Sequence, residues 1–221
     1  MLMIGLLISL AVNTTLAIST EGQRAPLAFD VYLDDEKIGI HKVNFERTDD
    51  TTTITTTAEF VYRILYIPVY RYEHRTVETW NQACLTSIDS QTDDNGDEFF
   101  IQSEAATPGM LIRTREGEIT VDECIRTYAY WDDQLLRTDK LLNTQNGRYQ
   151  PITYNDKGTE TYEFEDIRFE ARRVELDTEE GIISLWYDAE DNWVALESKV
   201  ESGAVVRYLS TTLTGSDQGD S

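Results

Sequence analysis

Residues 51–60 read TTTITTTAEF, and this run decides the fold class of the chain. Six of its ten residues are threonine. Threonine is β-branched, which restricts its χ1 rotamers and favours extended backbone over helix. The run therefore predicts a β-strand.

Similar runs continue on both sides of this strand. Apolar and polar residues alternate with a period of two in residues 27–33 and 38–46 before it, and in residues 70–80 and 84–92 after it. Segments rich in turn-forming residues separate these runs, and Asn95-Gly96 is the strongest hairpin signal because both residues tolerate positive φ angles. The N-terminal half is therefore predicted to be a series of antiparallel hairpins.

The C-terminal half repeats this pattern with one interruption. We expect strands at 99–104, on either side of 115–118, and at 148–153, 160–176, 182–187 and 193–213, the last of them interrupted at 201–203. Asp132 or Asp133 is expected to cap a short helix that ends at Leu142. So many hairpins cannot form one flat sheet, because strand twist makes long antiparallel sheets curl, close or split. The predicted fold is all-β: a single curled antiparallel meander, as a spiral β-roll or an open β-barrel, with one short helix.

The two ends of the chain differ from this domain. Residues 1–12 are an almost uncharged apolar run, and Thr15-Leu16-Ala17 offers the small residues that a signal peptidase recognises. We expect a signal peptide at 1–17, a flexible N-terminus at 18–25, the β domain at 26–213 and a disordered tail at 214–221. No second long apolar run follows, so the processed protein is expected to lack a transmembrane segment and to be soluble in the periplasm.

The charge of the chain excludes one class of partner. There are 41 acidic and 19 basic residues, a formal net charge of −22. Such a chain repels phosphate backbones, so nucleic-acid binding is not expected. We interpret the acidity as an aid to solubility.

Cys84 and Cys124 are the two cysteines of the chain. An even pair in an oxidising compartment favours a structural disulfide, Cys84–Cys124, over a redox site, and no Cys-x-x-Cys motif is present. The alternative is a pair of buried free thiols.

Residues for catalysis or metal binding are sparse. His41 and His74 are the two histidines, and no Gly-x-Ser-x-Gly motif occurs. A zinc site would need both histidines and a carboxylate such as Glu78 from different strands. Residues 91–102 resemble part of a calcium loop but lack its first Asp and last Glu, so we interpret them as a turn. We predict no catalytic residue, metal or cofactor.

Aromatic residues give the best candidate for a binding site. One face of residues 70–80 carries Tyr70, Tyr72, His74, Thr76, Glu78 and Trp80. In a curled sheet this face points inward and could line a cavity. Tyr128, Tyr130 and Trp131 could seal this cavity or only anchor the expected helix to the sheet. The candidate binding residues are Tyr70, Tyr72, His74, Trp80, Tyr130 and Trp131. The alternative is that the rings only pack the core and that His74 is inert.

Residues 61–69, VYRILYIPV, form an apolar run in which Pro68 argues against a central strand. We expect the run to fold over one end of the barrel as a plug. The alternative is an exposed patch for a lipid or a partner protein.

Several segments together resemble a known family: residues 29–35 with 38–39, 70–75, 92–96, 128–131, and 185–189 with 196–198. They are similar to the bacterial exported family of unknown function numbered 6134. The resemblance spans nearly the whole processed chain, and Cys84 and Cys124 fall where that family carries its pair. It implies no assigned activity. A more distant similarity to periplasmic spiral β-rolls and half-closed barrels implies a role in the envelope.

Three hypotheses about function follow. The first is a non-enzymatic envelope protein that holds a partner protein or an apolar small molecule in or beside the curled sheet. The second is a hydrolase centred on His74 with Glu73 or Glu78. The third is a purely structural module, which predicts no cavity larger than a few waters. The sequence does not indicate an oligomeric state.

Overall fold

The computed structural model describes residues 24–132, 135, 137–200 and 202–215. The predicted signal peptide, most of the predicted flexible N-terminus and most of the predicted tail lie outside these residues. The described strands are β1 Leu27–Leu33, β2 Glu36–Thr48, β3 Thr51–Ile64, β4 Ile67–Asn81, β5 Cys84–Asp94, β6 Asp97–Ala105, β7 Met110–Thr114, β8 Gly117–Val121, β9 Lys140–Leu142, β10 Tyr149–Pro151, β11 Thr153–Phe164, β12 Ile167–Thr178, β13 Gly181–Tyr187, β14 Trp193–Lys199 and β15 Val205–Ser210, followed by helix α1 Thr211–Thr214.

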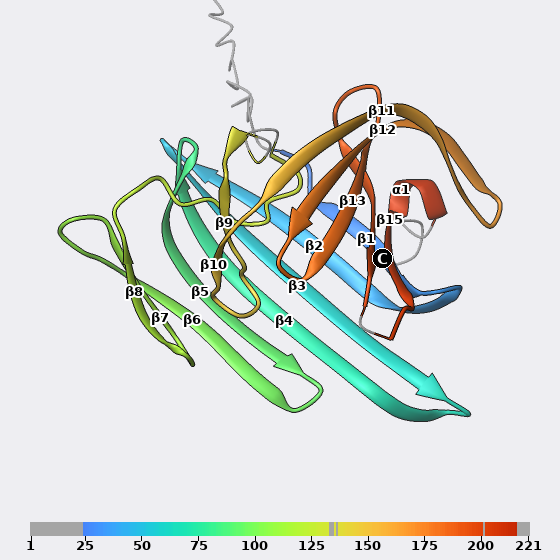
Figure 1. Ribbon diagram of the computed structural model, residues 1–221, viewed down its shortest axis with the longest axis horizontal. Coiled ribbons are helices and arrows are strands. Elements are labelled where there is room, and N and C mark those ends of the chain that lie inside the picture. The colour runs from blue at the N-terminus through green and yellow to red at the C-terminus, as the bar shows by residue number, and fades with distance from the viewer. Residues whose placement is uncertain (1–23, 133–134, 136, 201, 216–221) are drawn as a thin grey trace, which may run out of the picture.

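Thirteen of the described strands form one antiparallel sheet in the order β11-β12-β13-β14-β15-β1-β2-β3-β4-β5-β6-β7-β8 (Figure 1). The two halves of the chain join where β15 pairs with β1, with Phe29 opposite Ser210. The predicted curled antiparallel meander is therefore confirmed. Strands β8 and β11 are its edges and do not pair with each other, so the sheet is not closed into a barrel.

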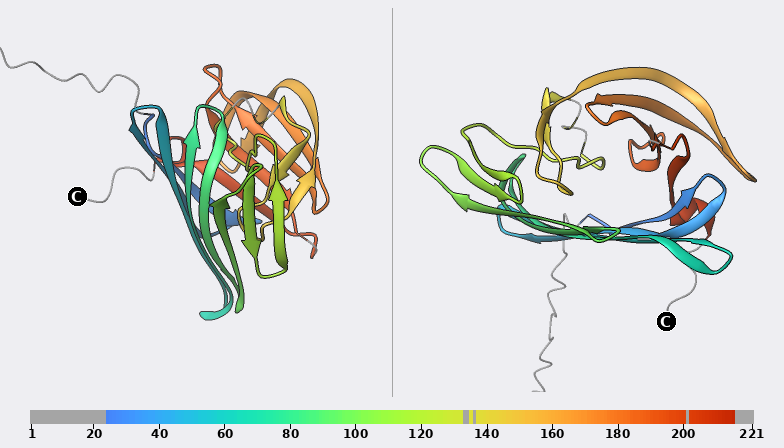
Figure 2. Two further views of the ribbon diagram at one scale, coloured as in Figure 1. Left: turned by 90° about the vertical axis from the view of Figure 1, so that its left-hand side faces the viewer. Right: turned by 60° about the horizontal axis from the view of Figure 1, so that its bottom comes forward.

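The sheet curls back over itself. In the right-hand view of Figure 2, the hairpin of β11 and β12 arches over strands β2–β5, and the chain around β9 and β10 lies between the two layers at one side. Strand twist favours this curl, and β-bulges at Ile38 of β2, Val69 of β4 and Thr86 of β5 increase the local twist. At Gly39 a Cβ atom would lie 1.9 Å from the carbonyl oxygen of Glu59, so only glycine allows β2 to approach β3 this closely.

Apolar side chains fill most of the space inside the curl. Trp193 of β14 packs on Phe29 of β1 with ring centroids 3.9 Å apart, and both side chains are buried. A second group of buried side chains lies around Ile54, Trp80 and Ile112 of the N-terminal half. The inner face of the sheet therefore provides these two groups. A third buried group includes Trp186 and Leu209, which alternate with inner-face residues along β13 and β15.

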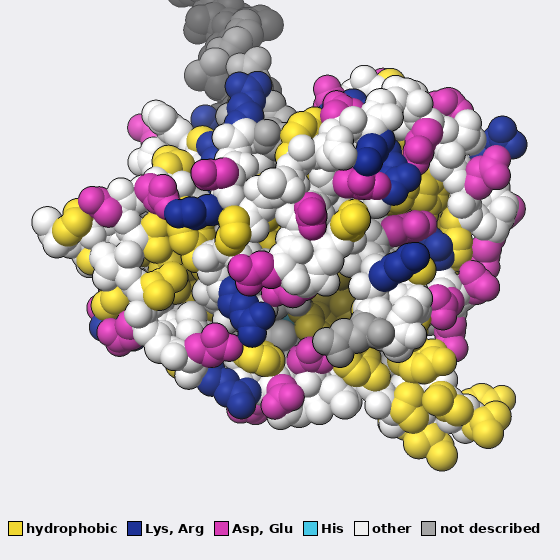
Figure 3. Space-filling view, in the orientation of Figure 1, with side chains coloured by type: hydrophobic (Ala, Val, Ile, Leu, Met, Phe, Trp, Pro, Cys, Tyr) yellow, Lys and Arg dark blue, Asp and Glu magenta, His cyan; other side chains and the backbone are white. Residues whose placement is uncertain are grey.

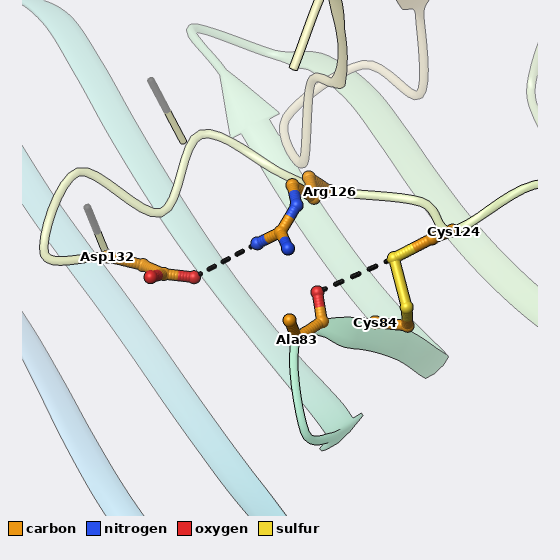
Figure 4. Close-up of a disulfide and its surroundings, with 5 residues drawn as sticks. All are labelled: Ala83, Cys84, Cys124, Arg126 and Asp132. Atoms are coloured by element: carbon orange, nitrogen blue, oxygen red, sulfur yellow. Dashed lines mark hydrogen bonds and ion pairs between the residues drawn. A yellow bond between two sulfur atoms is a disulfide. The ribbon is translucent and has the colours of Figure 1, made fainter. Parts of the chain in front are cut away.

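A crossing segment, residues 122–152, connects β8 to β11 by way of β9 and β10, and a disulfide links it to the sheet. Cys84 and Cys124 form the bond, with their Cα atoms 5.1 Å apart, which confirms the predicted pairing (Figure 4). Next to it the amide of Leu85 donates to the carbonyl of Ile125 at 3.1 Å. Arg126 forms an ion pair with Asp132 at 3.2 Å. These contacts position the residues between 126 and 132 over the inner face.

Two local predictions about secondary structure were wrong. The helix expected after Asp132 is not formed by the described residues there: Leu135 and Arg137 lie in 3₁₀ geometry and Lys140–Leu142 is strand β9. The short helix of the fold is instead α1, in a stretch expected to be strand. The expected single strand 160–176 is two strands, because Glu165 takes a positive φ of 51° in a turn. The leucines and acidic residues of 132–142 were compatible with helix or strand, and the pairing of β9 with β10 decided between them.

The predicted plug was also wrong. Residues 61–69 extend β3 and β4 into a long hairpin whose turn, Leu65-Tyr66, is exposed rather than folded over the sheet. Pro68 is accommodated because it pairs with Arg63 at a bulge close to the turn, where no further strand lies beside it.

Candidate functional site

The inner face of β4 is the starting point of the site. Its buried residues are Tyr72, His74, Thr76, Glu78 and Trp80, and each side chain is at most 6% exposed. Their neighbours Arg71, Glu73 and Arg75 point to solvent. The inward face expected from the alternation in residues 70–80 is thus present, with Tyr70 only half-buried at its end.

This face forms one wall of a cavity of about 340 Å³ between the two layers of the curled sheet. A hollow with hydrophobic side chains at its floor is visible near the centre of Figure 3. Three parts of the fold line the cavity. Strands β2–β4 contribute His41, Thr56, Ala58, Tyr72, His74, Thr76 and Glu78; the C-terminal half contributes Glu180, Ile183, Leu196, Ser198, Val200, Val206 and Tyr208; the crossing segment contributes Thr127, Tyr128, Tyr130, Trp131 and residues 143–146.

Two histidines, His41 and His74, line this cavity and differ in their hydrogen bonds. Both ring nitrogens of His41 are buried and have no hydrogen-bond partner among the described residues. Burial, together with the nearby His74, lowers the pKa of His41 to about 3. His74 has a partner, the hydroxyl of Thr92 at 2.9 Å from its Nδ1, and burial lowers its pKa to about 4. Both histidines are therefore neutral at pH 7.

Glu78 is the buried acid of the site. Its carboxylate accepts a hydrogen bond from the indole N–H of Trp80 at 3.1 Å and a second from the side chain of Thr127. Burial raises the pKa of Glu78 to about 7, and the two hydrogen bonds only partly oppose the effect. A fraction of the Glu78 carboxyls is consequently protonated at neutral pH.

Tyrosines complete the polar part of the cavity wall. The hydroxyl of Tyr72 is buried and has no hydrogen-bond partner among the described residues. Burial raises the pKa values of Tyr72, Tyr130 and Tyr208, so all three remain neutral at physiological pH. No lysine or arginine is among the residues that line the cavity in the described part of the chain. The cavity therefore offers aromatic surface and neutral hydrogen-bonding groups, with two acidic side chains, Glu78 and Glu180.

Four of the six predicted binding residues meet at this cavity: Tyr72, His74, Tyr130 and Trp131. Trp80 lies in a smaller adjoining cavity of about 250 Å³, together with Arg24, Phe45 and the other side of Trp131. Tyr70 does not line either cavity and packs instead against the cluster around Phe60.

Sequence reasoning missed Tyr208 and did not assign His41 to the cavity. His41 shares one face of its strand with Val43 and Phe45, so its inward direction was readable from the pattern. Tyr208 gave no such signal, because β15 meets β1 only through a pairing of distant segments.

The described residues hold no group of three or more His, Cys, Asp or Glu side chains suited to a metal ion. The zinc arrangement of His41, His74 and Glu78 that the sequence left open is therefore not assembled. No helix in the described part of the chain has the length and hydropathy that a membrane crossing requires.

Comparison with known proteins gives a family and no activity. No curated protein matches the chain. The family described as domain of unknown function DUF6134 matches residues 29–211, which include every described residue that lines the cavity. Because the match covers most of the chain in one continuous segment, the protein belongs to the DUF6134 family.

Proposed function

We propose that this protein is an exported envelope protein that holds a small, uncharged, ring-containing molecule in the cavity between the two layers of its curled sheet. One observation carries the proposal: the nitrogens of His41 and the hydroxyl of Tyr72 belong to side chains that line the cavity, and they are buried without a hydrogen-bond partner among the described residues. A buried polar group without a hydrogen bond costs about 1–3 kcal/mol, and a ligand with hydroxyl or carbonyl groups would remove that cost.

The charge of the cavity favours a neutral ligand. An anion would meet the carboxylates of Glu78 and Glu180 and no basic group among the lining residues. The aromatic rings of Tyr72, Tyr130 and Tyr208 favour flat or ring-shaped apolar parts.

The size of the cavity supports binding over a purely structural role. At about 340 Å³ it is larger than the few waters that a structural module would enclose, since liquid water takes about 30 Å³ per molecule. Export to the periplasm is part of the proposal and is supported by the apolar leader sequence and by the Cys84–Cys124 disulfide.

The hydrolase alternative has less support. Burial lowers the pKa of His74 to about 4, which leaves a weak general base at neutral pH, and Glu73 lies on the outer face of β4. We therefore favour binding without catalysis.

Two related fluorescent probes test the proposal. N-phenyl-1-naphthylamine is neutral, whereas 1-anilinonaphthalene-8-sulfonate has the same rings and an added sulfonate. We expect the neutral probe to bind with increased fluorescence and the anionic probe to bind at least about tenfold more weakly. Ala58→Leu, which places extra atoms in the cavity, should abolish binding of the neutral probe. Equal binding of both probes, or binding that Ala58→Leu does not change, would contradict the proposal.

Native mass spectrometry of protein purified gently from its own envelope, with and without organic extraction, would identify the natural ligand. We expect added mass that extraction removes.

A further inference from the structure

The β3–β4 hairpin projects beyond its neighbours in the sheet. Pairing of β2 with β3 ends at Gly39 and Phe60, and pairing of β4 with β5 begins at Tyr72 and Asp94. Residues 61–71 therefore form no ladder pairs with β2 or β5. In Figure 1 this hairpin is the long one at the lower right, and in Figure 3 its end is a knob of hydrophobic side chains.

The end of this hairpin, residues 64–69, is called the apolar tip below. Its exposed fractions are 86% for Leu65, 95% for Tyr66, 65% for Ile67 and 52% for Ile64. Val69 is 45% exposed. These side chains are exposed on both faces of the hairpin, because consecutive residues of a strand point in opposite directions.

The turn of the apolar tip contains residues for which its backbone conformation is unfavourable. Leu65 and Tyr66 have positive φ angles of 48° and 71°, as a two-residue type I′ turn requires. At the equivalent turn between β5 and β6 these positions are Asn95 and Gly96. Left-handed backbone costs a bulky L-residue roughly 1–2 kcal/mol. Folding alone would not favour Leu-Tyr at this turn, so another requirement is indicated.

The hairpin differs in charge from the rest of the chain. Residues 60–72 contain two arginines, Arg63 and Arg71, and no acidic residue, in a chain whose formal net charge is −22. Behind the turn follow Arg63 and then the cross-strand pair Tyr62 and Tyr70. The hairpin thus has apolar residues at its end, followed by arginine and tyrosine. This order is found where proteins enter the interface of a lipid bilayer.

We propose that the apolar tip inserts into the interface of a zwitterionic lipid surface. A convex tip exposed on both faces suits a medium that surrounds it, whereas a protein partner would contact a patch on one face. The net charge of the chain opposes strongly anionic membranes, so the attraction comes from burial of the tip side chains rather than from long-range charge.

The test compares three proteins on phosphatidylcholine vesicles by co-sedimentation at low and high salt. They are the wild type, the double variant Leu65→Asn/Tyr66→Gly, and Ile182→Asn as a control. Ile182 is 53% exposed, close to the value for Ile64, but lies at the start of β13. All three share the same N-terminal segment, so its apolar residues contribute equally to binding.

We expect the wild type and Ile182→Asn to bind the vesicles with little dependence on salt. The double variant should bind about a hundredfold more weakly, because each large apolar side chain withdrawn from lipid changes partitioning at least about tenfold. Hydrogen exchange should slow at residues 62–70 of the wild type when vesicles are added.

Three results would overturn this proposal: no binding by the wild type, equal binding by the double variant, or concentration-dependent self-association of the wild type that the double variant abolishes. The last result would assign the apolar tip to a second copy of the chain. Failure here is separate from failure of the cavity proposal, because the double variant should still bind N-phenyl-1-naphthylamine.

Discussion

The two ends of strand β4 depart from normal folding preferences in opposite directions. Toward its C-terminal end, His74, Thr76 and Glu78 are polar and buried. At its N-terminal end, Ile67 and Val69 are apolar and exposed. Folded proteins normally do neither at such a cost in free energy. Below, the part of β4 around His74, Thr76 and Glu78 is called the inner end, and the part around Ile67 and Val69 is called the outer end. The comparison indicates that both ends have a role other than stability: the inner end is proposed to bind a ligand and the outer end to contact a surface.

Removal of the disulfide is expected to change the free energy of unfolding more than any other substitution considered. The bond fastens the crossing segment beside the cavity and therefore affects only the inner end of β4. Cys84→Ser/Cys124→Ser removes a link across a sequence separation of 40 residues. The chain-entropy relation gives a loss in the free energy of unfolding of about 4 kcal/mol. Urea unfolding of the double variant and the wild type measures this difference.

The same variant should affect ligand binding in the cavity but not vesicle binding at the apolar tip. The crossing segment loses its fastening beside Leu85, so binding of N-phenyl-1-naphthylamine should weaken. Binding of the folded variant to vesicles should not change, since the apolar tip has no contact with the disulfide. An unchanged free energy of unfolding would show that the contacts of Ile125 and Leu142 hold the segment without the bond.

The second prediction concerns the pH dependence of stability that Glu78 causes at the inner end of β4. Burial raises the pKa of Glu78 from its ordinary value of 4.5 to about 7. As pH rises above 4.5 the unfolded chain releases this proton while the folded protein keeps it, so the folded state loses stability until about pH 7. The full penalty above that pH is about 3 kcal/mol.

Glu78→Gln removes this penalty and leaves an oxygen that can accept from Trp80. We expect the variant to match the wild type below pH 4.5 and to be more stable by up to about 3 kcal/mol at pH 8. The lowered pKa values of His41 and His74 make both proteins less stable as pH falls below 6.5, and this contribution cancels in the difference. Thermal unfolding at several pH values measures it, and a difference that stays constant from pH 4 to 8 would refute the assignment.

Much of the inner end was predictable from the sequence, because period-two alternation fixes which side chains share a face. Tyr72, His74 and Trp80 were assigned correctly to the inner side of β4 for this reason. Which side chains face them across the cavity depends on how the sheet curls and on the pairing of β15 with β1. Local pattern contains neither, so Tyr208 could not be placed.

The outer end was predicted wrongly for a related reason. Apolar composition normally means burial, and residues 61–69 were expected to cover the sheet. The sequence indicates that such a run needs a partner but not that the described residues leave it uncovered. The length by which β3 and β4 exceed β2 and β5 decides the exposure, and this difference follows only from the register of the whole sheet.

The third prediction compares two buried tyrosines. The hydroxyl of Tyr72 has no hydrogen-bond partner in the described part of the chain, whereas that of Tyr162 donates to Glu197 at 3.0 Å. Tyr162→Phe should therefore lower the free energy of unfolding by about 1–2 kcal/mol. Tyr72→Phe should leave it unchanged or raise it by up to about 1 kcal/mol, because the stacked contact with Phe60 is retained.

Ligand binding should respond in the opposite order. Tyr72→Phe removes a hydroxyl that the ligand is proposed to engage, so affinity for the natural ligand should fall about tenfold. Tyr162→Phe should leave affinity unchanged, because Tyr162 does not line the cavity. Chemical denaturation and titration of both variants give the two quantities, and a clear loss of stability in Tyr72→Phe would show that its hydroxyl is already satisfied.

The smallest expected effect is a gain in stability at the outer end. Leu65→Asn/Tyr66→Gly replaces two bulky residues at positive φ by the residues that a type I′ turn prefers, as at Asn95-Gly96. The free energy of unfolding should rise by about 1 kcal/mol, since part of the left-handed cost is removed and few packing contacts are lost from a turn that is 86–95% exposed. Urea unfolding without lipid measures the gain. Because the same variant is expected to lose vesicle binding, a gain in stability with a loss of binding would mean that the wild-type turn is retained at a cost to folding. A loss of stability would instead mean that Leu65 and Tyr66 support the hairpin itself, and the comparison between the two ends of β4 would then fail at its outer end.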